Sequence, residues 1–366
     1  MKIVGKTHFI SFTDAKFFYI IFKYKDGKMK RSYLNKIISA IVLISCFICQ
    51  AFILTSCAKN RIVEPVASDT FLSLDTVITV SIYKISGDDT MSYEAVLSEA
   101  KKVCEKYNTL FDPDDPSSDI YKINHAGGKS VNISEDTAYL IEKSLDLSLK
   151  TDGNIDISIY PLKLLWNEGK VPSPDDINKA LSHVGYKNII LDTDKNTVCL
   201  SDPEAAIDLG FIAKGYIADK IKERLISCGV KSAIIDLGGN VQTIGSKPDN
   251  STFNIGIKKP FSKNGEVIDT VNVSDISVVT AGTYERYFEE DGKIYHHILD
   301  PSTGYPADSG IVSATIIYPE STTADALSTA CIVLGYDKAV KLLDDHPMVR
   351  AVFVTDSGET LYYNYK

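Results

Sequence analysis

The apolar side chains of residues 70–366 recur with two different periods, which predict helices and strands in turn. The helical period predicts helices over 92–108, 135–150, 212–227, 323–334 and 337–345. Short runs typical of strands lie at 71–83, 232–236, 253–258, 269–273 and 310–318, and a hairpin is predicted over 351–363. Because these elements do not form a regular βαβ repeat, a doubly wound sheet is not favoured. The pattern predicts one α+β domain over 70–366 with a mixed, largely antiparallel sheet and packed helices, and not a Rossmann fold.

The N-terminal part has a different pattern, that of a membrane-targeting segment. Residues 37–56 are mostly apolar and contain no charged side chain, and the basic residues Lys30, Arg31 and Lys36 precede them. The run ends directly before Cys57, an order typical of a bacterial lipoprotein signal in which this cysteine is lipidated and becomes the mature N-terminus. An uncleaved transmembrane anchor is the alternative, because the run is near the ~20 residues that span a bilayer. Either interpretation places the rest of the chain outside the cytoplasmic membrane.

The leader also predicts the boundaries of the first segments. Met29 stands directly before the basic residues, as the start of a signal peptide does, so residues 29–56 are interpreted as that peptide. Residues 1–28 are then a mis-called upstream extension. The polar residues that follow the lipidated cysteine predict a tether over 57–69 between the cell membrane and the domain.

The charge of the chain limits its partners. The sequence has 39 Lys and Arg against 48 Asp and Glu, a net charge of −9. Removing the nine basic and two acidic residues of positions 1–56 leaves 30 basic and 46 acidic side chains, a net charge of −16. Such a surface argues against nucleic acid or an anionic membrane face as the partner. An anionic small ligand would need a local cation, either a metal ion or a lysine.

The cysteines do not indicate a metal centre. Cys46 and Cys49 form a CxxC pair inside the predicted signal peptide. The other cysteines of the mature chain apart from Cys57 show no metal-ligand spacing, and we expect them to be small buried side chains, with a single disulfide as the alternative. They are Cys104, Cys199, Cys228 and Cys331.

Chemically active groups concentrate at the ends of predicted elements in the last third of the chain. His297 begins the run His-Ile-Leu-Asp-Pro-Ser-Thr-Gly, which is typical of a strand that enters a turn. A structural role for this histidine fits the spacing as well as a catalytic one. Asp325 and Thr329 are four residues apart on a predicted helix, so they share a face. A carboxylate and a hydroxyl suit Mg²⁺, although the helix dipole alone also favours an acid in the first turn.

A second cluster, Asp208–Tyr216, lies at the entrance of the predicted helix 212–227. Asp208 is a candidate N-cap. Lys214 falls in the first turn, where the helix dipole disfavours a cation. A bound phosphate that contacts both Lys214 and the free backbone N–H groups would resolve this conflict. No GxGxxG sequence or Walker loop is present, which removes the two commonest nucleotide-binding motifs.

Two glycine-containing turns have both structural and functional interpretations. Gly153, within Thr151–Asp156, is typical of a helix C-cap followed by a loop. Gly238 and Gly239, within Asp236–Asn240, allow a ligand to approach the backbone closely, and a tight turn explains them equally well.

In this order, the segments resemble those of the ApbE-type FAD:protein FMN transferases, many of which are lipoproteins. The most specific part is His-Ile-x-Asp-Pro-x-Thr-Gly combined with Ala-Asp-Ala-x-x-Thr. Two positions depart from the family: Met-Gly-Thr is usual where this chain has Leu74-Asp75-Thr76, and a small residue is usual at Phe211. The matching pieces cover most of residues 70–335 and are Leu74–Thr76, Gly153–Asp156, Asp208–Tyr216, Leu237–Gly239, Ala281–Tyr284, His297–Gly304 and Ala324–Thr329.

The resemblance implies an ApbE-like domain with a Mg²⁺-dependent activity. The FMN part of FAD would pass to a Thr or Ser hydroxyl of another protein, and AMP would leave. The metal ligands would be Asp325, Thr329, the neighbouring Ser328 and the backbone carbonyl of Phe211. His297 is our candidate for the base that accepts the hydroxyl proton, and Asp325 would be catalytic through the metal. The residues that would contact FAD are Leu74, Phe111, Asn154, Ile155, Asp156, Asp208, Lys214 and Leu299.

The expected acceptor is an FMN-binding domain of a membrane-associated electron-transfer protein. Two other functions fit the same residues. One is an FAD pyrophosphatase, in which water accepts the FMN group. The other is a non-catalytic FAD-binding lipoprotein, which would need no metal, so the Asp325 and Thr329 pair weighs against it.

Overall fold

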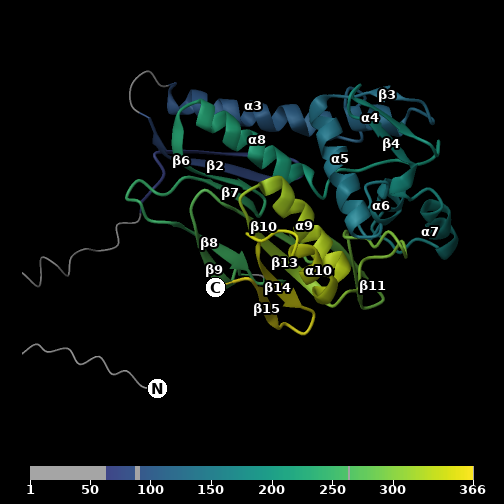
Figure 1. The fold of residues 1–366 in the computed structure, drawn as a ribbon. Helices are drawn as coiled ribbons and strands as arrows, with labels where there is room; N and C mark the ends of the chain where they lie inside the picture. Colours follow the sequence, from purple (N-terminus) through teal and green to yellow (C-terminus); the bar gives the residue numbers. More distant parts are fainter. Residues whose placement is uncertain (1–62, 87–90, 263, 366) are drawn as a thin grey trace, which may run out of the picture. The chain divides into compact units, whose positions relative to one another are not determined.

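The computed structural model (Figure 1) describes residues 63–86, 91–262 and 264–365. The predicted upstream extension, the signal peptide and Cys57 lie outside these ranges. Within them, no helix combines the length and the apolar composition that a bilayer span requires.

The central element is an eight-stranded sheet in which every neighbouring pair is antiparallel. In spatial order its strands are β1 (Ala67–Ser73), β2 (Thr76–Ile85), β6 (Val230–Leu237), β7 (Asn240–Ile244), β10 (Ser277–Gly282), β13 (Ile311–Tyr318), β14 (Arg350–Thr355) and β15 (Thr360–Tyr363). Their side chains alternate between the two faces, so each face builds its own apolar layer.

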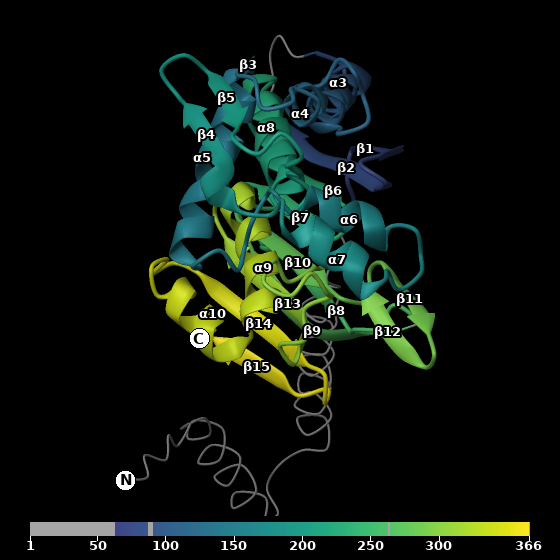
Figure 2. The ribbon, with the colours of Figure 1, turned by 90° about the vertical axis from the view of Figure 1, so that its right-hand side faces the viewer.

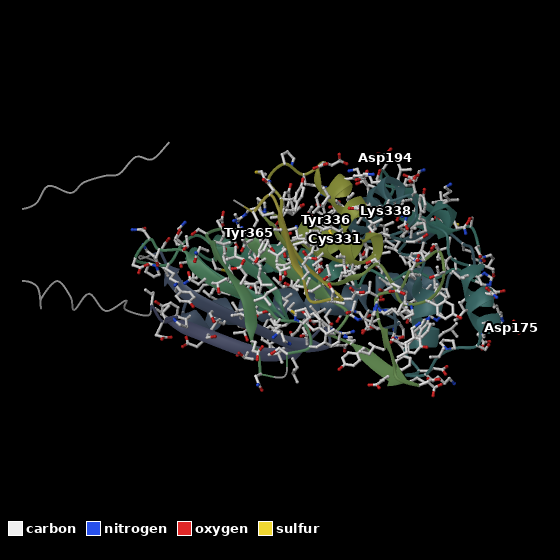
Figure 3. All side chains as sticks on the ribbon, turned by 90° about the horizontal axis from the view of Figure 1, so that it is seen from below. Asp175, Asp194, Cys331, Tyr336, Lys338 and Tyr365 are labelled. Carbon is white, nitrogen blue, oxygen red and sulfur yellow. The ribbon has the colours of Figure 1, made fainter. Side chains whose placement is uncertain are left out.

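Helices cover one face of this sheet and form the main core with it. The helices are α3 (Tyr93–Phe111), α8 (Ala213–Ser227), α9 (Ser321–Leu334) and α10 (Tyr336–Leu343), which Figure 1 shows on the same side of the strands. Ile78 and Ile235 of the sheet and Ile221 of α8 are fully buried in this core. Cys331 of α9, labelled with Tyr336 of α10 in Figure 3, is also fully buried.

A hairpin covers part of the opposite face. It consists of β8 (Phe253–Lys258) and β9 (Val267–Val273), and its Phe253 and Val271 pack on Val278 and Ile317 of the sheet. The two faces of the sheet are therefore buried by different elements.

Residues 119–200 form a group at one end of the helical layer (Figure 1). Its elements are α4 (Asp119–Asn124), β3 (Val131–Asn132), α5 (Glu135–Lys150), α6 (Tyr160–Trp166), α7 (Pro174–Leu181), a short 3₁₀ turn (Tyr186–Asn188), β4 (Ile189–Asp192) and β5 (Thr197–Leu200). Ile120, Ile141 and Val198 of this group belong to the main core, so it is continuous with the rest of the domain.

A second hairpin, β11 (Tyr287–Glu290) and β12 (Lys293–His296), projects beside α7 (Figure 2). Its Phe288 and Tyr295 stack on each other and lie against Trp166 of α6. The Trp166 indole N–H donates to the Gly304 carbonyl at 2.8 Å. This aromatic contact fixes the segment that leads from β12 into the His-Ile-Leu-Asp-Pro turn.

The contact between α8 and α9 is built from two carboxylates, one contributed by each helix. Asp219 of α8 accepts hydrogen bonds from the Ser321 and Thr322 N–H groups at 3.0 and 2.8 Å, which satisfies the start of α9. Asp325 of α9 in turn accepts from the Gly215 N–H in the first turn of α8, at 2.8 Å. A Cβ at Gly215 would lie 2.7 Å from the Asp325 Cβ and closer still to the Ser321 carbonyl, so only glycine allows this approach.

Most predicted elements are present, with ends shifted by a few residues. The predicted helices are α3, α5, α8, α9 and α10, and the predicted strands from 232 onward are β6, β8, β9, β13 and the β14–β15 hairpin. The α+β class with an antiparallel sheet is confirmed. The four cysteines of the described part are free, with Cys104 and Cys331 buried, as expected of small core side chains.

Three predictions differ from the structure. The single strand predicted over 71–83 is two strands, β1 and β2, joined by a turn in which Leu74 and Asp75 both have a φ of 54°. β1 begins at Ala67, inside the segment expected to be a tether. Asp208 does not cap α8, because the N-cap position is Ile212 and Asp208 bonds elsewhere.

We predict that Gly215→Ala lowers the free energy of unfolding by about 1–3 kcal/mol, because the added methyl forces α8 and α9 apart. Urea unfolding followed by circular dichroism measures this. Gly185→Ala is the matched control, since its Cβ would meet only the Asn188 side chain at 3.5 Å. Equal stability of the Gly215→Ala and wild-type chains would contradict the proposed tight contact.

Candidate active site

The junction of α8 and α9 gathers oxygen atoms that have few protein partners. Asp325 is 4% exposed, and only one of its carboxylate oxygens has a hydrogen-bond partner, the Gly215 N–H, in the described part of the chain. The Phe211 carbonyl precedes α8 by two residues. In a regular helix it would accept from the Gly215 N–H, but that group donates to Asp325 instead. Among the described residues, the second Asp325 oxygen and the Phe211 carbonyl are thus both without a hydrogen-bond donor, and the segments that carry them meet at Gly215.

The two other predicted metal ligands differ in accessibility. Thr329 is half-buried one turn after Asp325, on the same face of α9. Ser328 is fully buried, and its hydroxyl donates back to the Asp325 carbonyl at 2.8 Å. Among the described residues, no group of three or more His, Cys, Asp or Glu side chains is placed to hold a metal ion. The predicted set has a single carboxylate and depends on neutral oxygens for its other ligands.

Burial makes the Asp325 carboxylate electrostatically costly. Loss of water raises its pKa above the ordinary value, the nearby Asp219 charge adds to the rise, and the Lys214 ammonium and the Gly215 N–H oppose it. The net effect is a raised pKa. A second cation at this junction would stabilise the ionised form.

His297 lies near Lys214, and its hydrogen bonds define its protonation state. Its backbone N–H and its ring Nδ1 both contact the Arg286 carbonyl, at 3.2 and 3.1 Å. A carbonyl only accepts, so Nδ1 carries the proton and Nε2 keeps its lone pair free. Partial loss of water around the ring lowers the pKa of His297 to about 4, and the charges of Arg286 and Lys214 add to this. The ring is therefore neutral at pH 7, although its side chain is exposed to solvent.

Three cations lie near Glu285, and two of them, Lys214 and Arg286, also act on His297. Lys214, Lys258 and Arg286 all act to lower the pKa of Glu285, but burial, the larger effect, raises it. None of the three cations is in an ion pair within the described ranges, and we call them the basic cluster. In a chain with a net charge of −9, this cluster would attract an anion more than the rest of the surface does.

The predicted FAD contacts at 154–156 and at Asp208 are also brought together. The Asp208 N–H donates to the Ile157 carbonyl at 2.8 Å, which places the two segments side by side. Asp156 accepts from Ser158 and from the Tyr186 N–H, and Asp208 pairs with Lys163 at 2.8 Å and accepts from the Gly210 N–H. Both carboxylates shape these loops, which leaves mainly backbone groups to meet a ligand.

Other predicted contacts lie in the interior or at a separate turn. Phe111, Ile155 and Leu299 are between 5 and 7% exposed and pack in apolar clusters. The Asn154 amide donates to the Thr151 carbonyl at the end of α5. Leu74 lies in the β1–β2 turn, where its N–H donates to Asn108 of α3 at 3.3 Å. The structure does not bring these side chains together around one surface.

Sequence reasoning missed several residues of this region. They include Asp219, Glu285, Lys163, Lys258 and Arg286. No local pattern marks them, because their partners come from distant segments. Gly215 had a signal, since glycine inside a helix is costly and indicates a close approach of backbone.

The comparisons with known proteins agree on one family. The ApbE family matches residues 74–353. The FAD:protein FMN transferase of Klebsiella pneumoniae (strain 342) is 37% identical over 273 residues, which cover 73% of this chain and 84% of that protein. The ApbE protein of Thermotoga maritima is 33% identical with a TM-score of 0.75, over 81% of this chain and 97% of that structure. The flavinyl transferase ApbE of Pseudomonas stutzeri, solved in its apo form, is 28% identical with a TM-score of 0.71, over 81% and 94%.

We predict that Asp325→Asn raises the free energy of unfolding in metal-free buffer at pH 7, by about 1–3 kcal/mol. The raised pKa means that the folded wild type favours a protonated carboxyl, so wild-type stability falls as pH rises above the ordinary Asp range. An amide keeps an acceptor for the Gly215 N–H and removes this dependence.

Chemical denaturation between pH 4 and pH 8 in EDTA measures both effects. Asp192→Asn is the control, because Asp192 is surrounded by solvent and pairs with Lys195, so its change should stay within about 0.5 kcal/mol. If the Asp325→Asn chain is less stable than wild type under these conditions, the buried carboxylate does not destabilise the fold.

Proposed function

This chain belongs to the ApbE family, and from that premise we propose that it is an FAD:protein FMN transferase. The acceptor is a Thr or Ser hydroxyl of another protein. Its oxygen forms a bond to the FMN phosphorus, and the bond from that phosphorus to the bridging oxygen breaks. The bridging oxygen leaves with AMP, and the hydroxyl proton passes to a base. The observation that carries the proposal is the contact between α8 and α9, to which Asp325, Lys214 and the segment with the Phe211 carbonyl belong.

The oxygen atoms at this junction fit Mg²⁺. This ion prefers oxygen ligands, and it commonly takes one or two carboxylates and leaves other positions to water and substrate phosphates. Asp325, the Phe211 carbonyl and Thr329 would hold it. When bound, the ion would neutralise charge on the phosphate oxygens. The buried hydroxyl of Ser328 makes it a supporting residue in this proposal more than a direct ligand.

The basic cluster would bind the pyrophosphate. Lys214 lies in the first turn of α8, where the Ala213 and Gly215 N–H groups already have protein acceptors, so the ammonium is the group that would meet the phosphates. Lys258 and Arg286 add positive charge around Glu285. Cations that are already in place stabilise developing charge on phosphate oxygens without reorganisation.

His297 is placed to accept the proton of the acceptor hydroxyl. Its Nε2 is free, because Nδ1 is held by the Arg286 carbonyl. Its low pKa makes it a weak base, so it would take up the proton as the bond from the hydroxyl oxygen to phosphorus forms. The Arg286 carbonyl is therefore a positioning group for this base.

FAD hydrolysis is a second candidate, favoured by one observation. The His297 side chain is exposed to solvent, so water could take the place of the hydroxyl. Both reactions use the same groups and differ only in the acceptor.

We also propose that the enzyme is anchored by a lipid on Cys57 and acts on the extracytoplasmic face of the cell membrane, where a membrane-associated electron-transfer protein would supply the FMN-binding acceptor domain. The support is the sequence pattern of residues 29–57. Cell fractionation with and without Cys57 tests this anchor.

We predict covalent transfer of FMN when the full-length chain in detergent is mixed with FAD, Mg²⁺ and such an acceptor domain. Mass spectrometry of the denatured acceptor should show the added FMN, and EDTA or Asp325→Asn should abolish it. The opposite result is undiminished labelling in EDTA, which would remove the metal from the proposal. Free FMN and AMP without labelled acceptor would favour the hydrolase.

We predict that kcat/KM for the acceptor falls on the acid side with an apparent pKa near 4, because His297 stays neutral until that pH. A steady-state pH profile measures it, and His297→Ala should lower the rate by about 10²–10⁴-fold and remove this limb. His346→Ala serves as a control on a distant histidine. An acid limb near pH 6.5, or full activity of His297→Ala, would exclude His297 as the base.

A further inference from the structure

Three large apolar side chains are exposed next to the candidate active site. Phe261 is 46% exposed, Tyr287 is 50% exposed and Ile294 is 42% exposed. Single exposed apolar residues are common on protein surfaces, but neighbouring ones often mark an interaction site. We call these three residues, of which two are aromatic, the aromatic patch.

The strand pairing sets the direction of two members of the patch. In the β11–β12 hairpin, Phe288 pairs with Tyr295, and both pack on Trp166. Residues on alternate positions of a strand point to opposite faces. Tyr287 and Ile294 therefore point away from Trp166 and toward solvent, on the outer face of the hairpin that Figure 2 shows projecting beside α7.

Phe261 joins this face from a different segment. It follows β8, and its ring lies 5.9 Å from the Tyr287 ring and 5.7 Å from the Tyr284 ring. Its φ is +57°, a left-handed conformation that a bulky residue rarely adopts. Phe261 is therefore an exposed aromatic residue at a backbone position that favours glycine or asparagine.

The patch is continuous with the groups that would perform the transfer. Tyr287 pairs with His296, directly before His297. The residue before Tyr287 is Arg286, whose carbonyl holds the His297 ring at 3.1 Å. Tyr287 is therefore one residue away from both the group that orients His297 and the strand that leads into it.

We propose that the aromatic patch docks the segment of the acceptor protein that carries the hydroxyl. This inference rests on the proposed transferase function and names the surface that its second substrate uses. The basic cluster accounts for the pyrophosphate of FAD, and the affinity for FAD measured below separates a docking surface for the acceptor from a surface for the flavin or adenine ring. Water needs no docking surface at all.

The chemistry of the patch specifies the segment. Apolar side chains next to the acceptor hydroxyl would cover Tyr287 and Phe261. Lys258, which lies 5.7 Å from the Tyr284 ring centre, belongs to the basic cluster and is assigned to the pyrophosphate. The occupant is a segment that combines a hydroxyl with apolar neighbours.

The test uses the full-length chain with Phe261→Asn and Tyr287→Thr together. Asparagine suits the left-handed backbone at 261, and threonine suits the strand at 287, so both changes remove a ring without opposing the fold. The matched control is Tyr362→Thr on β15, which is also 46% exposed. Figure 3 labels its neighbour Tyr365, which lies away from the β11–β12 hairpin.

Two readouts are measured with a purified FMN-binding domain as the probe. The first is the KM for this domain in FMN transfer, and the second is its binding affinity when its acceptor threonine is replaced by alanine. We expect the double variant to raise both KM and Kd by roughly tenfold or more, as loss of aromatic contacts at an interface does. The affinity for FAD should stay within about twofold of wild type.

The outcomes separate this inference from the function on which it rests. Unchanged KM and Kd in the double variant, or an equal rise in Tyr362→Thr, would overturn the docking surface while leaving the transferase intact. A wild-type chain that binds the domain through the patch but transfers no FMN would overturn the proposed function and leave the surface in place. A wild type that neither binds nor labels the domain would overturn both.

Discussion

Reciprocal hydrogen bonds from two carboxylates, one on α8 and one on α9, set the geometry of the site. Asp219 of α8 satisfies the first N–H groups of α9, and Asp325 of α9 accepts from the first turn of α8. These hydrogen bonds require the two helices to lie so close together that no Cβ fits at Gly215. The bond to Asp325 also takes the Gly215 N–H from its normal acceptor, the Phe211 carbonyl. This packing contact therefore leaves one Asp325 oxygen and the Phe211 carbonyl without a donor in the described part of the chain.

The electrostatics of the site follow from this burial. An ionised Asp325 is disfavoured in the interior, and a bound divalent cation would turn that cost into affinity. The basic cluster then supplies attraction for phosphates in an otherwise acidic chain. His297 is neutral at pH 7 because its pKa is low, and its Nε2 can therefore accept a proton. Burial thus sets the charge of Asp325, while the Arg286 carbonyl sets the tautomer of His297.

The sequence predicted the helices well where their apolar period is long and regular, as in α3 and α5. It misread 71–83 because the strand pattern continues through Leu74 and Asp75, which lack the glycine that usually marks a hairpin turn. The residues Lys214, His297 and Asp325 were singled out by their positions at the ends of predicted elements, and the family resemblance gave their expected roles. Asp219 and Glu285 were not, because Asp219 bonds to a residue 102 positions away and Glu285 lies in a cluster of charges that only the fold assembles. The side chains of Phe111 and Leu299, which are predicted to contact FAD, are buried.

We propose that the α8–α9 junction binds a divalent cation beside the pyrophosphate of FAD. Anomalous diffraction from crystals of this protein grown with Mn²⁺ and FAD would locate that ion. We expect one anomalous peak within about 2.0–2.3 Å of an Asp325 carboxylate oxygen and of the Phe211 carbonyl. FAD bound with its pyrophosphate elsewhere, or with no metal peak at this junction, would contradict it.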